Sequence, residues 1–592
     1  MEAGIETNTM MDNGAEVLFD VPVRMRDGTI LRANVFKPTR DGTHPVLVTR
    51  LPYGKDRFPA LVDPLRGVQR GYIVVVQDVR GRGRSGGTWE PFVHEADDGE
   101  DTVRWAKELP GSNGQVGLFG ASYMGFTQWA AASRSPAGLF ALAPFVSAGS
   151  LRSSLRRGGA RELGLGLFWS LLLAPDTILR RYAGDPLALF QKLVPIVEDI
   201  DGIDALYASA SLPERADPEG LLDSFRRGLT AGPTDPEVAE LDIDPWVGAV
   251  TVPTLHGTGW WDLFLGEVLR QYELVDQRAR QEGRTPPHLV IGPWTHTGYG
   301  SAAGDLAFGL TASSMLVNYH GDLADVHLDF FDRARGRRVI GLEPSPVELF
   351  IVGENRWRSY SRWPVPNSTP EAWYLHSDGT AQSRHGSGTL SRQPPGAERH
   401  DTYRYDPDHP VPTRGGNILM PEHHRAGPLD QRENEGRPDV LCFTSDVVTE
   451  PYTAIGRAHV TLYAASSARD TDFVARLVDV HPDGRAIGIA DGVVRASWRE
   501  IYAVPGEVRP GPTSAIEPDR VYRYTIDLWA TGITFLPGHR IRLEVTSSNF
   551  PRWDKNPNDG SDGLGAAAAP VVAVQRIFHD AEHPSALVLA HV

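Results

Sequence analysis

The stretch Val116-Gly-Leu-Phe-Gly-Ala-Ser-Tyr-Met-Gly125 says more about the fold than any other part of the chain. It begins as an apolar strand, turns at Gly120-Ala121-Ser122 and continues into a helical segment over 126–132. Small residues around a serine between a strand and a helix are typical of a nucleophile elbow, because the serine occupies a strained turn. Ser122 is therefore a candidate nucleophile. A plain glycine-rich turn is the alternative, since the second glycine of the usual G-x-S-x-G pattern falls one place late, at Gly125.

Short apolar runs on both sides of this elbow predict a mostly parallel sheet. They lie at 46–48, 73–76, 140–146, 253–256 and 288–291, with helical segments such as 97–108 between them. Continuous apolar runs suit strands that are buried on both faces. Nearer the N-terminus, polar and apolar residues alternate around Asp27-Gly28, which predicts an antiparallel hairpin. We expect an α/β-hydrolase architecture, with helices on both faces of the sheet.

Two regions depart from this pattern. Residues 151–250 have helical apolar spacing broken by Asp-Pro and Gly-Pro pairs, which predicts a helical cap. From about residue 344 onward, short alternating strands separated by Gly, Pro and Asp predict an all-β domain, a sandwich or jelly roll. The expected domains are therefore an α/β domain over 1–150 and 251–343, a cap over 151–250 and a jelly-roll domain over 344–592.

An elbow serine needs a base and an orienting acid, which follow it along the chain in the order acid, then histidine. Asp262 comes just after one predicted strand, and His296 comes just after the next. Because catalytic groups gather beyond the carboxyl ends of parallel strands, both are expected on the same edge as Ser122. The sequence thus predicts a Ser122–His296–Asp262 triad. Either residue alone would be interpreted as an ordinary surface or core group.

Composition excludes several other classes of protein. The chain has 592 residues, a formal net charge of −16 and one cysteine, Cys442. An acidic surface repels nucleic acid, and a single cysteine rules out an intrachain disulfide, a thiolate zinc cage and an iron–sulfur cluster. His423 and His424 have no third ligand at metal spacing, so we expect loop residues there and no metal or cofactor.

The location and the assembly of the chain are expectations of the same kind. The N-terminus is acidic and lacks the apolar core of a signal peptide. The apolar run 164–173 is about half the length of a membrane span, so it is expected to form a buried helix or a pocket wall. We expect a soluble cytoplasmic protein with no membrane partner. Its oligomeric state stays open, with a homodimer as one option.

Several motifs in a fixed order resemble the cocaine esterase/X-prolyl dipeptidyl peptidase family of serine hydrolases, over nearly the whole chain. In the first half they are Arg50-Leu-Pro-Tyr-Gly-Lys-Asp56, Gln77-Asp-Val-Arg-Gly-Arg-Gly83, Glu95-Ala-Asp-Asp98, Gly120-Ala-Ser-Tyr-Met-Gly125, Gly259-Trp-Trp-Asp262 and Gly292-Pro-Trp-Thr-His296. In the second half they are Tyr405-Asp-Pro407, Pro412-Thr-Arg-Gly-Gly416, Asp430-Gln431 and Ser547-Ser-Asn-Phe-Pro551. The elbow of this family reads G-x-S-Y-x-G, which explains the position of Gly125.

The resemblance implies roles for individual residues. It implies Ser122, Asp262 and His296 as the triad, the Tyr53 phenol as an oxyanion donor and the backbone N–H of Tyr123 as the second donor. Donors of this kind fit acyl transfer, which builds negative charge on the carbonyl oxygen. Asp78 and Arg80, in the glycine-rich run after one strand, are expected to make structural polar contacts beneath the site.

The resemblance also bears on the substrate. The residues expected to bind it are Phe168, Trp169, Trp261 and Phe264, with plain core packing as the alternative for the first two. The apolar run Leu263-Phe264-Leu265 stands where family members that act on α-amino esters resemble one another in having acids. An ester with an apolar or aromatic acyl group is therefore the expected substrate. Amide or X-Pro dipeptide cleavage, acyl transfer by the same triad, and an inactive carbohydrate-binding protein are the alternatives.

Overall fold

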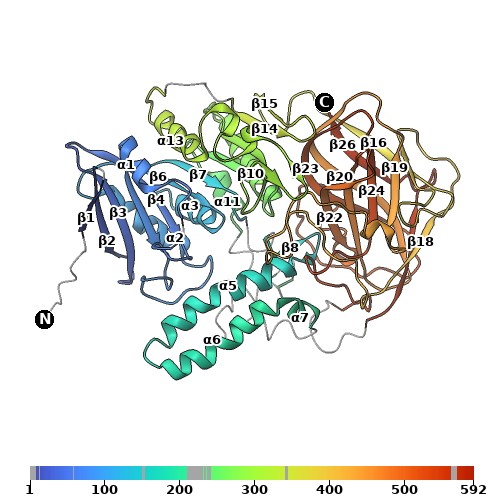
Figure 1. The fold of residues 1–592 in the computed structure, drawn as a ribbon, viewed down its shortest axis with the longest axis horizontal. Coiled ribbons are helices and arrows are strands. Elements are labelled where there is room, and N and C mark those ends of the chain that lie inside the picture. The colour runs from blue at the N-terminus through green and yellow to red at the C-terminus, as the bar shows by residue number, and fades with distance from the viewer. Residues whose placement is uncertain are drawn as a thin grey trace.

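The elbow strand lies within an eleven-stranded mixed sheet in the computed structural model (Figure 1). The structure describes residues 9–12, 14–57, 59–149, 154–209, 231–232, 235, 242–339, 345–561 and 570–592. In spatial order the strands are β1 (Thr9–Asp12), β2 (Ala15–Arg24), β3 (Ile30–Pro38), β5 (Ile73–Asp78), β4 (His44–Leu51), β6 (Ser112–Ala121), β7 (Leu139–Phe145), β10 (Leu255–Trp261), β11 (His288–Thr295), β14 (Val347–Ile351) and β15 (Arg356–Tyr360).

The central strands of this sheet are parallel, as their apolar composition predicts. Every pair from β5 to β14 is parallel, whereas β1, β2, β3 and β15 pair in the antiparallel sense. Strands β4, β5 and β10 are buried along their whole length. Burial on both faces requires covering layers, and helices supply them.

Helices cover both faces of the sheet. Helices α2 (Glu95–Lys107), α3 (Tyr123–Ser133) and α11 (Asp244–Ala249) share one apolar cluster on one face. Helix α12 (Leu265–Gln281) packs beside α11. On the other face, α13 (Leu323–Ala334) packs on the sheet and is tied by ion pairs to α1 (Pro64–Arg70). The predicted α/β architecture is confirmed.

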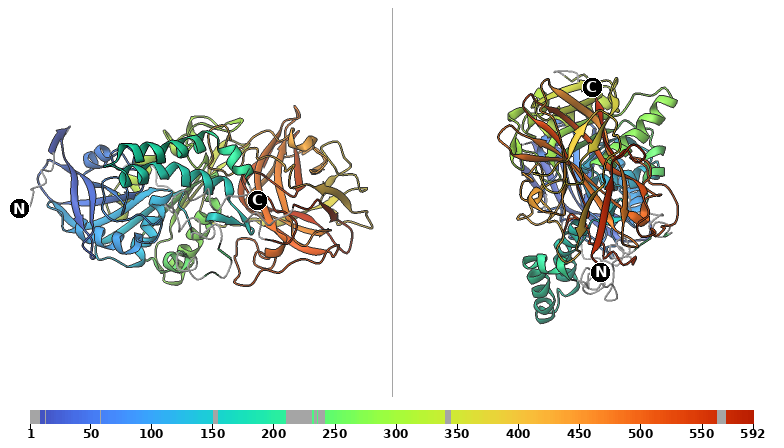
Figure 2. Two further views of the ribbon diagram at one scale, coloured as in Figure 1. Left: turned by 90° about the horizontal axis from the view of Figure 1, so that it is seen from below. Right: turned by 90° about the vertical axis from the view of Figure 1, so that its right-hand side faces the viewer.

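A helical hairpin stands out from this body beneath the sheet (Figure 2). It consists of α5 (Leu163–Arg181) and α6 (Pro186–Asp201), followed by the short α7 (Ile203–Ala208) and preceded by the hairpin β8 (Arg156–Arg157) and β9 (Ala160–Arg161). By length and composition α5 could cross a membrane, but 56% of its most apolar window is buried inside the protein, as in a core helix. Much of the predicted cap, including 210–230, lies outside the described residues.

The C-terminal half forms an all-β domain around its own apolar core. Its strands are β16 (Thr369–His376), β17 (Thr389–Ser391), β18 (Asp401–Tyr405), β19 (Leu441–Ser445), β20 (Tyr452–Ser466), β21 (Asp472–Val480), β22 (Ala486–Arg495), β23 (Tyr522–Phe535), β24 (Arg540–Thr546), β25 (Ala573–Phe578) and β26 (Ala586–His591). All their pairings are antiparallel except that of β17 with β19.

The junction between the two domains differs from the expectation in one respect. Strands β14 and β15 follow residue 344, the predicted start of the β domain, yet β14 pairs in parallel with β11 and extends the first sheet. An alternating pattern is the same in an edge hairpin of a mixed sheet and in a sandwich strand, so the sequence alone cannot separate them. The two domains meet where Val352 bridges to Ile533 of β23.

Candidate active site

Ser122 occupies a strained turn between β6 and α3. Its backbone has φ 60° and ψ −121°, a conformation that a non-glycine residue rarely adopts. Gly125 explains the displaced glycine of the motif, because a Cβ at this position would lie 2.6 Å from the Cβ of Ser147. Gly120 has φ +137°, and a Cβ there would lie 2.5 Å from the Cβ of Met124. The helix can therefore start directly after the serine only if both positions lack side chains.

The three predicted triad residues each follow a parallel strand directly and lie in contact. Ser122 follows β6, Asp262 follows β10 and His296 follows β11. His296 Nε2 lies 3.0 Å from the Oγ of Ser122, and His296 Nδ1 lies 2.7 Å from Oδ1 of Asp262. Asp262 is fully buried, and the other two side chains are reached from the pocket described below. The geometry is that of a nucleophile, a base and an orienting acid.

Two further residues hold Asp262 in place. The Thr258 hydroxyl donates a hydrogen bond to Oδ2 of Asp262 at 2.7 Å. Asn417, which belongs to a loop after β18, donates from Nδ2 to the backbone oxygens of Trp260 and Asp262 at 3.0 and 2.8 Å. The β domain therefore takes part in building the site. Asn417 could not be predicted from the sequence, because nothing in its local sequence points to a contact 155 residues away.

The two predicted oxyanion donors, the Tyr53 phenol and the backbone N–H of Tyr123, belong to residues that line the same pocket as Ser122. Tyr53 lines the same pocket as Ser122, and its hydroxyl accepts a hydrogen bond from Trp169 Nε1 at 3.2 Å. Burial raises the pKa of Tyr53, and hydrogen bonds with Trp169 and Ser122 only partly offset it, so the phenol stays protonated at neutral pH. Tyr123 is the first residue of α3, so its N–H has no acceptor within the helix.

The loop that carries Tyr53 is fixed from below by polar contacts. Asp78 accepts hydrogen bonds from the backbone N–H groups of Lys55 and Arg84 at 2.6 and 3.0 Å. Arg82 donates to the Pro52 oxygen at 2.8 Å and to the Leu173 oxygen on α5 at 3.0 Å. Arg80 pairs with Asp98. The prediction that Asp78 and Arg80 make structural contacts is confirmed.

The pocket above Ser122 is largely apolar and has a volume of about 440 Å³ including its open mouth. Its described lining consists of Tyr53, Phe92, Ser122, Tyr123, Ala148, Ser154, Leu155, Leu165, Trp169, Phe264, His296 and Leu419. Trp169 and Phe264 therefore lie where the sequence analysis expected them. Phe264 packs edge-on against His296, with ring centroids 5.3 Å apart. None of these described lining residues is a carboxylate.

The other two predicted substrate-binding residues are not among the residues that line this pocket. Trp261 is 1% exposed and stacks on Phe308 in the core shared with the β domain, with ring centroids 5.7 Å apart. Phe168 is half-buried and packs in the apolar cluster of the cap. In β10 successive side chains point to opposite faces, and the sequence did not show which face Trp261 takes.

Two groups of side chains that could hold a metal ion occur elsewhere in the described ranges, and neither includes a residue of the pocket. One consists of Asp479, His481 and His539. The other corrects the expectation that His423 and His424 lack a third ligand. Asp204 of α7 lies 3.0 Å from His423 Nε2 and 2.8 Å from His424 Nε2. The sequence could not show this, because Asp204 is more than 200 residues away along the chain.

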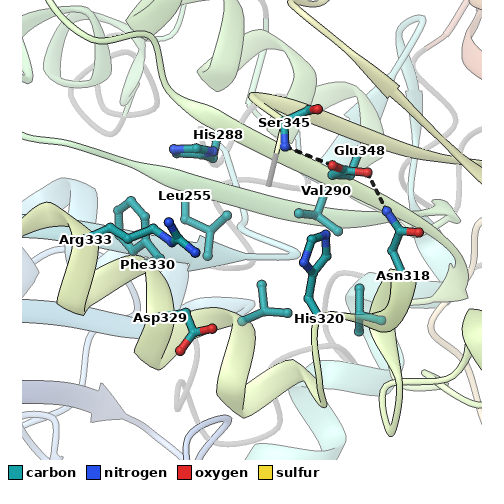
Figure 3. Close-up of a pocket in the computed structure, with 12 residues that line it drawn as sticks. Leu255, His288, Val290, Asn318, His320, Asp329, Phe330, Arg333, Ser345 and Glu348 are labelled. Carbon is teal, nitrogen blue, oxygen red and sulfur yellow. Dashed lines mark hydrogen bonds between the residues drawn. The ribbon is translucent and has the colours of Figure 1, made fainter. Parts of the chain in front are cut away.

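A second cavity, of about 600 Å³, lies at the opposite edge of the sheet (Figure 3). Leu255 and His288, which line it, are the first residues of β10 and β11, whereas Asp262 and His296 follow the last. Figure 3 shows Glu348 in this cavity, accepting hydrogen bonds from the Ser345 N–H and from Asn318 Nδ2. The cavity contains no residue of the triad, so the elbow pocket is the candidate active site.

Comparisons with known proteins agree with this architecture. Residues 27–298 match the family model of X-Pro dipeptidyl-peptidase (S15 family), and residues 342–588 match that of the X-Pro dipeptidyl-peptidase C-terminal non-catalytic domain. The chain is 37% identical to a cocaine esterase of Rhodococcus sp. (strain MB1 Bresler) over 98% of this chain and 99% of the relative.

Solved structures share the fold over the full length. An α-amino acid ester hydrolase has a TM-score of 0.75 and 24% identity, covering 100% of both chains. An aminopeptidase from the marine sediment archaeon Thaumarchaeota archaeon has a TM-score of 0.74 and 24% identity, covering 100% of this chain and 99% of the other. At this identity the two structures establish the arrangement of the domains and nothing about the substrate.

Proposed function

The chain belongs to the serine hydrolase family of the X-Pro dipeptidyl-peptidases and cocaine esterase, and from this we propose that it cleaves carboxylic esters through an acyl-enzyme intermediate. The observation that carries the proposal is the chain of contacts from Ser122 Oγ through His296 to Asp262, at 3.0 and 2.7 Å. It stands at the floor of an apolar pocket. No cofactor takes part in this chemistry.

The proposed first step is acylation of Ser122. His296 Nε2 accepts the proton of the serine hydroxyl while Oγ attacks the ester carbonyl carbon, and Asp262 stabilises the imidazolium that forms. The Tyr53 hydroxyl and the Tyr123 N–H donate hydrogen bonds to the resulting oxyanion. When the tetrahedral intermediate collapses, the C–O bond to the alcohol breaks and His296 returns the proton to the leaving oxygen. Water then repeats the sequence on the acyl-enzyme and releases the acid.

The acyl pocket favours neutral, apolar or aromatic acyl groups. Trp169, Leu165, Leu419 and Phe264 supply an apolar wall, and the described lining contains no carboxylate. An ammonium placed there would lose its hydration without a charge partner, at a cost of several kcal/mol. The Ser154 hydroxyl is buried at this wall without a hydrogen-bond partner, and it offers a single polar contact to an acyl substituent.

The decisive experiment compares phenylacetate and phenylglycine esters of one alcohol, which differ by a single amino group. We expect kcat/KM for the phenylacetate ester to exceed that of the charged phenylglycine ester by at least about 100-fold, which corresponds to about 2.7 kcal/mol. Intact-mass measurement of the trapped acyl-enzyme should show the acyl group on Ser122. Equal rates for the two esters, measured where the amine is protonated, would contradict the pocket assignment.

Release of an X-Pro dipeptide is the second candidate, because the matching family models carry that description. An enzyme of that kind must hold the N-terminal ammonium of its substrate, and the described lining offers no carboxylate for it. X-Pro amides therefore serve as the competing substrates in the same assay. Faster turnover of an X-Pro amide than of its matched aryl ester would replace the esterase proposal. Acyl transfer to an amine remains a third outcome, seen as an amide product instead of the free acid.

A further inference from the structure

Two histidines and an aspartate meet at one end of the β21–β24 ladder in the β domain. In this antiparallel pair Asp479 lies opposite Ile541, and Val480 lies opposite Arg540. The same register, continued by one residue, places His481 opposite His539. Residues directly opposite each other share a face of the sheet, and side chains two apart along a strand do so as well. Both imidazoles and the Asp479 carboxylate are therefore directed to the same side.

The distances among these three side chains suit a metal ion. His539 Nδ1 lies 2.8 Å from Oδ1 of Asp479, and His481 Nε2 lies 3.4 Å from Oδ2. All three ligand atoms lie within 4.8 Å of one another. A tetrahedral Zn²⁺ site with bonds of about 2.0–2.1 Å requires ligand atoms about 3.3–3.4 Å apart. The observed separations of 2.8 and 3.4 Å lie close to that spacing.

The surroundings hold the three ligands in position. Backbone hydrogen bonds from Val448 to His539 and from Gly538 to Val448, each 2.8 Å long, fix the turn before β24. The β21–β22 turn is closed by a 2.8 Å bond from the His481 N–H to the Arg485 oxygen. The Asp479 side chain is 7% exposed, whereas His481 and His539 remain 17% and 11% exposed. An ion can therefore enter from solvent and keep a water ligand.

We propose that Asp479, His481 and His539 bind one Zn²⁺ ion, through a carboxylate oxygen, Nε2 and Nδ1, with water in the fourth position. Two imidazoles and one carboxylate are ligands that Zn²⁺ accepts readily. Each imidazole binds as the neutral tautomer, with its remaining proton on the ring nitrogen that faces away from the ion.

The positive charge of Arg485 disfavours Zn²⁺ binding, so replacing this residue provides a sensitive test of the proposed site. Its Nη2 lies 3.4 Å from His481 Nδ1, the nitrogen that must carry the proton when Nε2 binds zinc. With zinc bound, the N–H of the Arg485 guanidinium and the N–H of His481 would face each other and repel. Arg485 therefore has to turn toward Asp483, to which its Nε already donates at 2.8 Å. Replacing Arg485 with Gln removes the charge, and we expect it to tighten Zn²⁺ binding several-fold.

The ion acts on the stability of the β domain and not on catalysis. It links the β21–β22 turn to the start of β24, and none of its ligands lines the catalytic pocket. Asp204, His423 and His424 offer the same residue types between α7 and a loop, but Asp204 and His423 there are 61% and 56% exposed. Exposed side chains lose more freedom on binding, so this second cluster is expected to be weaker. This second cluster must be removed by mutation before Zn²⁺ binding at the proposed site is measured.

The test titrates ZnCl₂ into chelator-treated, full-length protein that carries His423→Ala and His424→Ala. We expect one ion per chain by calorimetry, a higher thermal unfolding temperature with zinc, and the visible bands of tetrahedral Co²⁺ when cobalt replaces it. In this background His539→Ala and Asp479→Asn should each weaken binding at least about 100-fold, which corresponds to about 2.7 kcal/mol. Arg485→Gln should strengthen it, and rates of ester hydrolysis should not change with zinc.

Two results would overturn the proposal. One is the absence of calorimetric binding at about 1 mM Zn²⁺ in folded protein, since an ion that binds more weakly than this would not stabilise the β domain. The other is a stoichiometric site that survives His539→Ala unchanged, which would place the ion elsewhere. If His539→Ala fails to fold, as judged by circular dichroism, the Arg485→Gln variant decides: unchanged or weaker affinity in that variant contradicts the site.

Discussion

The α/β domain and the β domain each contain an aspartate–histidine pair with almost the same contact. In the first, Asp262 Oδ1 lies 2.7 Å from His296 Nδ1, and in the second, Asp479 Oδ1 lies 2.8 Å from His539 Nδ1. Both carboxylates are buried. The pairs differ in the third group. His296 presents Nε2 to the Ser122 hydroxyl, whereas Asp479 presents its second oxygen to another imidazole. An Asp–His pair alone therefore does not define a chemistry.

The backbone determines which third side chain lies next to each Asp–His pair. Ser122, Asp262 and His296 each follow a parallel strand, and the carboxyl ends of parallel strands meet along one edge. That edge brings together residues that are far apart in sequence, including a serine on a strained turn. At the end of an antiparallel ladder, cross-strand partners instead come together as pairs, here His481 and His539. The first arrangement suits a relay of protons, and the second suits a shared ion.

Removing the proposed nucleophile should have the largest effect, and it should affect only the first of the two Asp–His sites. Ser122→Ala is expected to lower kcat/KM for an aryl ester at least about 10⁴-fold, because His296 and Asp262 have no other oxygen to activate. The measurement is steady-state hydrolysis, with circular dichroism as the check on folding. Zn²⁺ affinity at the β-domain site should stay unchanged, which makes the same variant its own control. Substantial acyl-enzyme turnover in the purified variant would refute the assignment of Ser122.

The next largest effect is expected from removing the hydroxyl of Tyr53, the proposed oxyanion donor. Tyr53→Phe should lower kcat by about 10²–10³ with a smaller change in KM, since the phenol donates mainly to charge that develops in the transition state. Trp169→Phe is the matched control, because it removes the hydrogen bond to the Tyr53 oxygen and leaves the phenol in place. A decrease in kcat of less than about threefold in Tyr53→Phe, under about 1 kcal/mol, would remove Tyr53 from the mechanism.

Much of the site could be predicted from the sequence because its residues have local signatures. The elbow is a contiguous motif, and Asp262 and His296 each follow an apolar run that reads as a buried strand. Asn417 has no such signature, since its role depends on how the β domain packs against the end of β10. The same limit applies to Asp204 beside His423 and His424, and to β14, whose alternating pattern fits either domain. Contacts between domains depend on how the domains pack, and the spacing of apolar residues in the sequence does not reveal that packing.

Asn417 allows a smaller and more specific test of how the β domain supports the other domain. Asn417→Ala should lower kcat about tenfold, or about 1.4 kcal/mol, because the chain around Asp262 loses two hydrogen bonds that hold it. KM should hardly change, since Asn417 is not among the residues that line the pocket. Asn434→Ala is the control, because Asn434 is also buried in the β domain and its side-chain amide donates to the Pro412 oxygen at 3.0 Å, within the same domain. Equal loss of kcat in both variants would indicate general destabilisation.

The smallest expected effect concerns how the two domains respond to acid. His327 of α13 is buried, with Nδ1 2.7 Å from the Leu323 oxygen, and burial lowers its pKa to about 4. The unfolded chain binds a proton at this histidine below about pH 6.5, whereas the folded chain does not until about pH 4. The stability that His327 contributes is therefore complete above pH 6.5 and is lost as the pH falls toward 4.

Asp430 in the β domain behaves differently over the same range. Burial tends to raise its pKa, but bonds from Arg432 and the Ala486 N–H hold the pKa below the ordinary value for aspartate. Its contribution to stability is therefore lost only below about pH 3.9, the ordinary pKa of an aspartate. Between pH 7 and 5.5 Asp430 stays ionised in both the folded and the unfolded chain, and its contribution is constant.

Urea unfolding at pH 7 and pH 5.5 separates the two groups. From His327 alone, the free energy of unfolding should fall by about 1 kcal/mol between these values, and His327→Gln should remove that part of the pH dependence whatever it does to absolute stability. Asp430→Asn should leave the dependence as it is in the unmodified protein. An unchanged slope in His327→Gln would mean that this histidine takes up its proton in the folded α/β domain as readily as in the unfolded chain.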